Sequence, residues 1–366
     1  MKIGILTSGG DCPGLNAVIR AIGLYALNNM ENVEIVGIPE GYGGLIRGEC
    51  RPLRRQDFSD ILDRGGTILG TSRQPYKLMT VEENGETRLQ EMCSNYQKMG
   101  LDCLFTLGGA GTHKTAALLC AEGCNVIGLP KTIDNDIYGT DVTFGFQTAA
   151  EIAAESIDRI RTTAAGHGRT MLVEIMGNKA GWLALHAGLA AGADMILIPE
   201  IPFSLDAVCE FVQKSAERKG ASDWERPYNI IAVAEGAVLD SEAAYKKKDR
   251  AFARIERGES TVTQHLAEIV EERTGVETRT SVLGYLQRGG TPCAYDRLLS
   301  SRLGAFAADL AAKGVFGVSV AVSGNRIVYN ALAEIAGRYK LVEPDGELVR
   351  FAKSIGIRFG DAQKIS

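Results

Sequence analysis

The sequence predicts an α/β protein whose parallel sheets carry helices on both faces. Two observations predict this fold class. Short runs rich in β-branched residues alternate with helical patterns along most of the chain, and glycine-rich turns follow several of these runs. With 366 residues, the chain is long enough for two domains of ordinary size or for one large α/β body.

The elements follow one another in the order that such a fold requires. The apolar run Ile3–Leu6 predicts a strand, a glycine-rich turn follows it, and the pattern of Leu15–Asn29 predicts a helix. Near the C-terminus, a short polar turn separates the runs Gly317–Ala321 and Arg326–Asn330, which predicts a hairpin. The other expected elements are strands at Val33–Ile38, Leu101–Leu107, Asn125–Leu129, Thr170–Met176, Met195–Pro199 and Asn229–Ala234, and a helix at Ala116–Cys120.

Composition indicates a soluble globular protein, with 45% hydrophobic and 23% charged residues. The net charge of -5 gives no electrostatic reason to expect nucleic acid or an anionic membrane as a partner. No apolar run approaches the roughly 18 residues of a membrane span, and the chain begins with a strand instead of a secretion signal. Its eight cysteines form no Cys-x-x-Cys pair, so we expect reduced thiols and a cytoplasmic location.

The segment Pro130–Asp136, with the sequence PKTIDND, is the strongest functional signal. It directly follows the apolar run Asn125–Leu129, so two carboxylates, a hydroxyl and a lysine lie at a strand end. Ligands of parallel α/β sheets bind at that end of the strands. One carboxylate there can take a proton from a substrate hydroxyl while its neighbour holds Mg²⁺.

Two glycine-rich turns are candidate phosphate sites. Ser8–Asn16 links the first strand to the first helix, and Leu107–Thr112 links a later strand to the helix that follows it. Backbone N–H groups approach an anion closely at such turns, and the helix N-terminus adds a favourable dipole. The first turn lacks the Lys-Ser/Thr of a P-loop and the spacing G-x-G-x-x-G, so neither Walker nor Rossmann dinucleotide binding is supported. An ordinary βα turn remains an alternative for each.

Taken together, these motifs resemble those of the phosphofructokinases, which phosphorylate fructose 6-phosphate at its 1-hydroxyl. The resemblance runs from Lys2 to about Phe306. It implies an α/β fold of two similar Rossmann-like lobes with mainly parallel sheets and an active site in the cleft between them. A phosphoryl-donor (nucleotide) lobe is expected at residues 1–145 plus 290–335. A sugar-phosphate lobe is expected at residues 146–289 plus 336–366.

The resemblance also implies roles for the catalytic residues. In the PKTIDND segment, Asp134 would be the base that accepts the proton of the sugar hydroxyl, Thr132 would orient the same region, and Asp136 would act on Mg²⁺. Arg73 follows a GGTILG turn and resembles the arginine that reaches the phosphoryl group in flight. In the first turn, Gly10 would contact the phosphate that is transferred.

The second turn resembles the nucleotide loop of the family, with one departure. The family usually has Asp where this chain has Ala110, and that side chain commonly helps to hold Mg²⁺. Either Asp136, phosphate oxygens and waters therefore hold the metal, or the activity is weak. The residues of this turn expected to contact the donor are Gly108, Gly109, Gly111 and Thr112.

The segment Glu277–Gly290 resembles the family's clamp for the sugar 6-phosphate. Arg279 and Arg288 would donate to the phosphate, with Tyr285 where many relatives carry His. Arg169 and Arg279 resemble arginines that a neighbouring subunit contributes, so a homodimer or homotetramer with a shared active site is expected. The other expected sugar contacts are Met176, Gly177, Asn178, which replaces the usual Arg, and the strand-end Glu235.

The sequence sends two signals about the phosphoryl donor. Pyrophosphate-using members of the family usually carry Asp where this chain has Gly111, and that carboxylate excludes the α-phosphate of a nucleotide. They also carry Lys where this chain has Lys131, whereas common ATP-using members have Gly there. A carboxylate block is harder to bypass than a lysine, which can serve either donor. We therefore expect ATP as the donor, with pyrophosphate as the alternative.

Functions of other classes fit the sequence less well. A catalytically weak sugar-phosphate sensor remains an alternative, because Ala110 and Asn178 remove two expected helpers. A nicotinamide dehydrogenase lacks the G-x-G-x-x-G signature. A lipid or NAD kinase with a related glycine loop does not account for the PKTIDND segment or the QRGG sequence that ends at Gly290.

Overall fold

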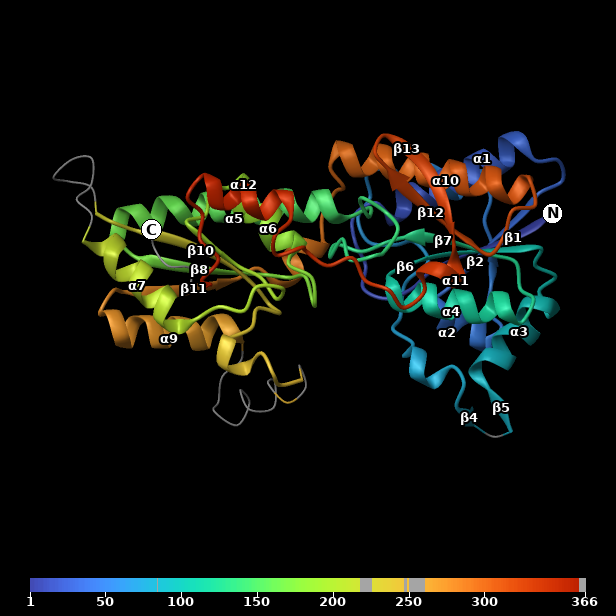
Figure 1. Cartoon of the computed structure of the whole chain (residues 1–366). Helices are drawn as coiled ribbons and strands as arrows, with labels where there is room; N and C mark the ends of the chain where they lie inside the picture. Colours follow the sequence, from blue (N-terminus) through green and yellow to red (C-terminus); the bar gives the residue numbers. More distant parts are fainter. Residues whose placement is uncertain (84, 218–225, 247–248, 250–260, 362–366) are drawn as a thin grey trace. The chain divides into compact units, whose positions relative to one another are not determined.

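The computed structural model describes residues 1–83, 85–217, 226–246, 249 and 261–361. The chain divides into two compact units, Met1–Thr148 with Arg288–Lys340 and Ala149–Gln287 with Leu341–Ser366 (Figure 1). Residues 362–366 of the expected sugar-phosphate lobe lie outside the described part. Each unit holds a sheet flanked by helices, so the predicted α/β class is confirmed.

The first unit contains a seven-stranded, mostly parallel sheet. In spatial order its strands are β13 (Arg326–Ala331), β12 (Val318–Ser323), β7 (Val126–Pro130), β6 (Cys103–Gly108), β1 (Lys2–Thr7), β2 (Glu34–Ile38) and β3 (Arg51–Pro52). Only the outermost pairs, β12 with β13 and β2 with β3, are antiparallel within this sheet. Every residue of β6 and β7 is buried, which explains why both strands are continuous apolar runs in the sequence.

Helices cover both faces of this sheet (Figure 1). On one face lie α1 (Leu15–Asn29) and α10 (Ala294–Ala312), and on the other α2 (Tyr42–Arg47), α3 (Arg88–Lys98) and α4 (Ala110–Ala121). Gly304 lets α10 approach α1 closely, since a Cβ there would lie 2.7 Å from the carbonyl oxygen of Val18. The smaller elements are α11 (Leu332–Ile335), the strands β4 (Glu82–Glu83) and β5 (Glu86–Thr87), and 3₁₀ turns at Arg55–Phe58 and Tyr76–Leu78.

The second unit contains a four-stranded sheet in which the strands run parallel. Their order is β11 (Thr278–Val282), β8 (Thr170–Ile175), β10 (Asn229–Ala234) and β9 (Met195–Leu197). One face carries α5 (Phe146–His167), α6 (Trp182–Ala190) and α12 (Glu347–Ser354), and the other carries α7 (Leu205–Ala216) and α9 (Val262–Thr274) (Figure 1). Two 3₁₀ turns lie at Asp240–Glu242 and Gly284–Arg288.

The structure confirms the strands predicted from the apolar runs and the C-terminal hairpin, with small shifts of their ends. It adds β11, in a segment that the sequence indicated only as ligand-binding. None of the helices in the described part of the chain combines the length and apolar character needed to cross a membrane.

Candidate functional site

In the first unit, three loops follow the carboxyl ends of the neighbouring strands β1, β6 and β7. Backbone hydrogen bonds join the loops where they leave the sheet. The N–H of Ser8 donates to Leu107 O at 2.9 Å, and the N–H of Lys131 donates to Gly108 O at 3.0 Å. Both predicted glycine turns and the PKTIDND segment therefore meet at one edge of this sheet, as expected for a parallel sheet.

The turn after β1 has cations on two sides. Lys131 Nζ donates to the carbonyl oxygen of Gly10, and Arg288 Nη1 donates to Asp11 O at 3.0 Å. A Cβ at Gly10 would lie 2.9 Å from Arg288 Nη1, so a side chain there would displace the guanidinium. Together with the N-terminus of α1, these cations make the turn suitable for a phosphate group.

Cys12 lies within the same turn, but its thiol faces inward. The side chain is fully buried, and Sγ donates to Phe144 O at 3.4 Å. Burial raises the pKa of the Cys12 thiol to about 12. The thiol is therefore protonated at neutral pH and contributes no nucleophile to the site. Cys50, by contrast, is exposed.

The loop after β6 begins helix α4 at Ala110. Gly108 must be glycine here, since a Cβ would lie 2.1 Å from Thr112 Oγ1. Thr112 is buried, and its carbonyl oxygen accepts from the Tyr42 hydroxyl at 2.9 Å. At Gly111, in contrast, a Cβ would have no atom within 4 Å, so the protein itself leaves room for a side chain.

Arg73 lies close to these loops. The carbonyl oxygen of its neighbour Ser72 accepts a hydrogen bond from the N–H of Gly9 at 3.0 Å, and Thr71 Oγ1 donates to Gly9 O at 2.6 Å. The Arg73 side chain is exposed. The segment around Arg73 is thus fixed to the turn that contains Gly10, which places the arginine beside the candidate phosphate site.

The PKTIDND segment forms a buried loop that carries two carboxylates. Thr132, Asp134 and Asp136 are all buried, and the N–H of Asp134 donates to Thr132 Oγ1 at 3.0 Å. Burial, together with the negative charge of Asp134, raises the pKa of Asp136 to about 6. Two buried carboxylates whose charges repel one another would be stabilised by a divalent cation.

The described residues provide no group of three or more Cys, His, Asp and Glu that could hold a metal by themselves. Mg²⁺ commonly binds through one or two carboxylates together with phosphate oxygens and waters, so Asp136 could hold it without further protein ligands. Ala110, in the loop after β6, has no oxygen in its side chain, so that loop adds no carboxylate to the site.

Two lysines adjoin the carboxylates, and only Lys131 was predicted from the sequence. Lys131 is buried, which lowers the pKa of its ammonium group. Lys340 donates to Thr140 O at 2.9 Å and to Asp141 O at 2.7 Å, and so contacts the loop that carries Asp136. Burial lowers the pKa of Lys340 to about 8, so this amine remains mostly protonated at neutral pH. No local pattern in the sequence marks Lys340, which is an isolated lysine far along the chain.

In the second unit, three of the predicted sugar-binding residues share one cavity. A cavity of about 200 Å³ is lined by Glu174, Met176, Glu235, Val282, Gly284 and Tyr285. Glu235 Oε1 accepts from the N–H groups of Gly177 at 3.3 Å and Asn178 at 2.7 Å, which fixes this turn. Tyr285 is 79% exposed. Glu174, a buried carboxylate in β8, was not predicted from the sequence, because its surroundings there are typical of a strand.

Arg169 and Arg279 lie at the other end of the same sheet. Both pair with Glu277, Arg169 at 2.6 Å and Arg279 at 2.7 Å. Arg169 directly precedes β8, whereas Met176 directly follows it. Six strand residues at about 3.3 Å each separate the two ends by about 20 Å, so Arg169 lies at the opposite end of β8 from the cavity that Met176 and Tyr285 line.

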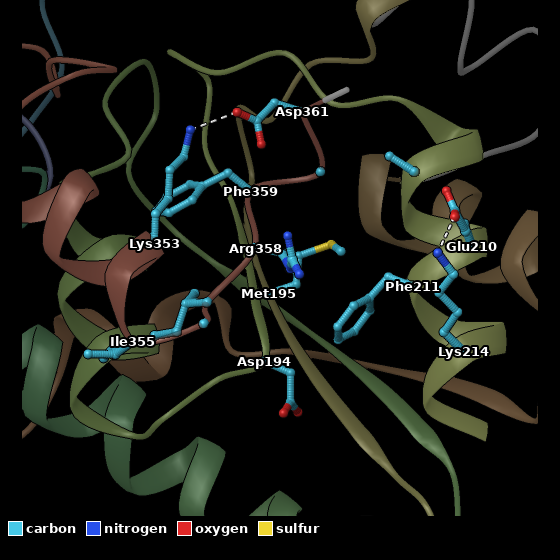
Figure 2. A pocket seen from close by; sticks show the side chains of 14 residues that line it. Asp194, Met195, Glu210, Phe211, Lys214, Lys353, Ile355, Arg358, Phe359 and Asp361 are labelled. Atoms are coloured by element: carbon cyan, nitrogen blue, oxygen red, sulfur yellow. Dashed lines mark hydrogen bonds and ion pairs between the residues drawn. The ribbon is translucent and has the colours of Figure 1, made fainter. Parts of the chain in front are cut away.

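A second cavity in this unit contains none of the predicted site residues (Figure 2). It measures about 510 Å³ and lies between β9, α7 and the segment after α12. Figure 2 shows two ion pairs in its wall, Lys353 with Asp361 and Lys214 with Glu210. Arg358 and Phe211 also line it.

The first unit carries glycine turns, flanking cations and buried carboxylates at one edge of its parallel sheet. This arrangement is typical of α/β proteins that bind phosphorylated ligands. Comparison with known proteins specifies the class further. The sequence profile described as Phosphofructokinase matches residues 2–311. The chain belongs to the phosphofructokinase family.

Individual relatives differ in the donor that their names state. The chain is 50% identical to an ATP-dependent 6-phosphofructokinase of Spirochaeta thermophila, over 98% of this chain and 97% of the relative. It is 48% identical to a pyrophosphate–fructose 6-phosphate 1-phosphotransferase of Amycolatopsis methanolica, over 94% of this chain and 97% of the relative. Among solved structures, Pichia pastoris phosphofructokinase in the T-state is similar, with a TM-score of 0.76 and 32% identity. That match covers 92% of this chain but only 35% of the yeast chain.

Proposed function

We propose that this protein transfers a phosphoryl group from ATP to the 1-hydroxyl of fructose 6-phosphate, giving fructose 1,6-bisphosphate, a step of glycolysis in the cytoplasm. The observation that carries the proposal is the buried carboxylate pair of Asp134 and Asp136 beside the turn that contains Gly10. Relatives that share about half of the sequence are named for this reaction. Phosphoryl transfer requires such an arrangement, because it depends on positioning and on neutralising charge.

The residues of the first unit would act on the donor and on the acceptor hydroxyl. Asp134 is the base that takes the proton from the sugar, and Thr132 fixes its backbone. Arg73 and the Gly10 turn neutralise charge on the moving phosphoryl group, and Lys131 holds that turn through Gly10 O. Arg288, which the sequence led us to expect at the sugar 6-phosphate, donates to Asp11 O of the same turn and so lies on the donor side in this structure.

The nucleotide would lie against the loop that contains Gly108, Gly109, Gly111 and Thr112, at the start of α4. Asp136 would hold Mg²⁺ with the help of phosphate oxygens and waters, and Mg²⁺ would screen the negative charge of the donor. The residues of the second unit that would bind the sugar are Met176, Gly177, Asn178, Glu235 and Tyr285, most of which surround the cavity of about 200 Å³.

A comparison of the two donors tests the proposal. The Spirochaeta relative is named for ATP and the Amycolatopsis relative for pyrophosphate, and Lys131 also favours pyrophosphate as the second candidate. Gly111 favours ATP. We expect fructose 1,6-bisphosphate to form with ATP and Mg²⁺ in a coupled assay. Turnover with pyrophosphate alone would establish the second candidate, and binding of fructose 6-phosphate without turnover would indicate a sensor.

Replacing Gly111 by Asp should separate the donors. The new side chain has open space around it, so the fold should remain intact. Its carboxylate would oppose the nucleotide phosphates, and because like charges in contact cost several kcal/mol, we expect kcat/KM for ATP to fall at least about 100-fold. Gly166 also has open space, and Gly166→Asp should change kcat/KM less than about twofold as a surface substitution. An unchanged kcat/KM for ATP in Gly111→Asp would contradict the assignment of this loop.

We also propose that Arg169 and Arg279 serve the sugar phosphate of a neighbouring subunit, in a homodimer or homotetramer. The distance of about 20 Å between the ends of β8 supports this, because it separates Arg169 from Met176 of the same chain. The strong exposure of Tyr285 fits a surface that another chain could cover.

Mixing two inactive variants should restore activity if sites are shared. In a hybrid of Asp134→Asn and Arg279→Ala subunits, one site carries both defects and the other carries neither. After subunit exchange, we expect up to about a quarter of the wild-type activity in a dimer, because half of the dimers are hybrids with one intact site each. Light scattering should show a dimer or tetramer. A monomer, or a mixture as inactive as its components, would contradict the proposal.

A further inference from the structure

The segment 338–340 lies against the loop that carries the two aspartates. The guanidinium carbon of Arg338 lies 3.5 Å from the ring centroid of Tyr138, a cation–π contact. Tyr339 forms an antiparallel β-bridge with Ile137. Consecutive residues of this segment thus contact consecutive residues of the loop, which is the pattern of a short added strand.

Lys340 makes the most extensive of these contacts. Its N–H donates to Asp136 O at 2.9 Å. Its ammonium donates to Asn135 Oδ1 at 3.0 Å, to Thr140 O at 2.9 Å and to Asp141 O at 2.7 Å. An ammonium group has three donors, and here three oxygens from both ends of the loop accept from it. One cation therefore fixes the distance between residue 135 and residues 140–141.

Asn135 is the residue that needs such a restraint. It lies between Asp134 and Asp136, it is buried, and its backbone has φ 51°, in the left-handed region. Asparagine tolerates this sparsely populated conformation better than most residues, and contacts that hold its side chain help to keep the backbone there. Asn135 Oδ1 also accepts from the N–H of Thr143 at 3.1 Å, so Lys340 and Thr143 hold the same oxygen.

We propose that Lys340 is a positioning residue for phosphoryl transfer, which holds the loop in the conformation that aims the Asp134 carboxylate. The proposal rests on the proposed function of Asp134 as the base. Lys340 lies beyond residues 2–311, the part of the chain that matches the family profile. The loop that the family motif defines is thus held by a residue from outside the matched region.

Replacing Lys340 by Met tests this proposal, since Met has a similar length but no donor. We expect kcat to fall about 10–100-fold, because small misplacement of a catalytic group has effects of this size. KM for fructose 6-phosphate should change less than about threefold, because Lys340 would not touch the sugar. Lys340→Arg should recover part of kcat, since a guanidinium also donates several hydrogen bonds. Lys353→Met is the matched control, because Lys353 pairs with Asp361 in the second unit, and it should retain kcat.

Hydrogen exchange supplies a readout that does not depend on activity. In Lys340→Met, amides of residues 134–143 should exchange at least about tenfold faster, while amides of β6 keep their wild-type rates. If the wild-type protein shows no turnover, the proposed function is overturned. The exchange rates still test whether Lys340 holds the loop. Wild-type kcat in Lys340→Met, unchanged exchange in the loop, or faster exchange that is equal in the loop and in β6 would each overturn the role of Lys340.

Discussion

Replacing Asp134 by Asn is expected to lower kcat by about 10²–10⁴-fold, the usual contribution of a positioned general base. Asn has the same shape as Asp but cannot accept the proton of the sugar hydroxyl. The hydrogen bond from the N–H of residue 134 to Thr132 Oγ1 does not involve the side chain of residue 134. The loop should therefore keep its conformation in the variant. Steady-state kinetics with ATP and fructose 6-phosphate would show this as a loss in kcat with little change in KM.

A matched control lies seven residues further along the chain. Asp141 is exposed, and its carboxylate accepts from the N–H of Gly324 at 2.6 Å, a bond that Asn can also accept. Asp141→Asn should therefore retain kcat. Turnover near the wild-type value in Asp134→Asn would remove the base from the proposed mechanism, whatever the behaviour of the control.

Replacing Asp296 by Ala should strongly lower the free energy of unfolding. The side chain is completely buried, Oδ1 accepts from the N–H of Gly145 at 3.0 Å, and Oδ2 accepts from both the N–H and the hydroxyl of Thr148, at 2.8 and 2.6 Å. Alanine would leave three buried donors without this acceptor. Because each such donor costs about 1–3 kcal/mol, we expect the free energy of unfolding to fall by at least about 3 kcal/mol.

Denaturant unfolding of the purified variants measures this effect. Asp296→Asn keeps one oxygen acceptor and should lose less stability than Asp296→Ala. Asp206 is 91% exposed and pairs with Arg273 at 2.8 Å, so Asp206→Ala should change the free energy of unfolding by less than about 1 kcal/mol. If Asp296→Ala were as stable as Asp206→Ala, the buried hydrogen bonds of Asp296 would not contribute measurably to stability.

The sequence predicted the elements that are buried on both faces, because a short continuous apolar run is typical of a strand covered by helices on both sides. β6, β7 and β10 are of this kind. β11 was missed because it is an edge strand whose sequence, Thr-Arg-Thr-Ser-Val, is largely polar and mostly not buried. The strands β4 and β5 have two residues each, too few to show any periodicity.

The candidate site was predictable where it depends on loops that follow strands. Parallel strands bring their carboxyl ends to one edge, and Gly10, Gly108 and Lys131 each follow a predicted strand. Lys340 could not be expected there. It is 205 residues from Asn135 along the chain, and only the folded first unit brings the two together at 3.0 Å. Lysines are usually exposed, so composition gives no hint of its contacts.

The inward orientation of Cys12 has a consequence for chemical modification. Oxidants and alkylating reagents attack thiolates, and a buried thiol with a pKa of about 12 offers almost none at neutral pH. Cys50 is exposed, so we expect such reagents to react with this cysteine first. A spectroscopic label or an affinity tag can therefore be attached at Cys50 while the turn beside Gly10 remains chemically unchanged. Mild oxidation should likewise leave the candidate phosphate site intact.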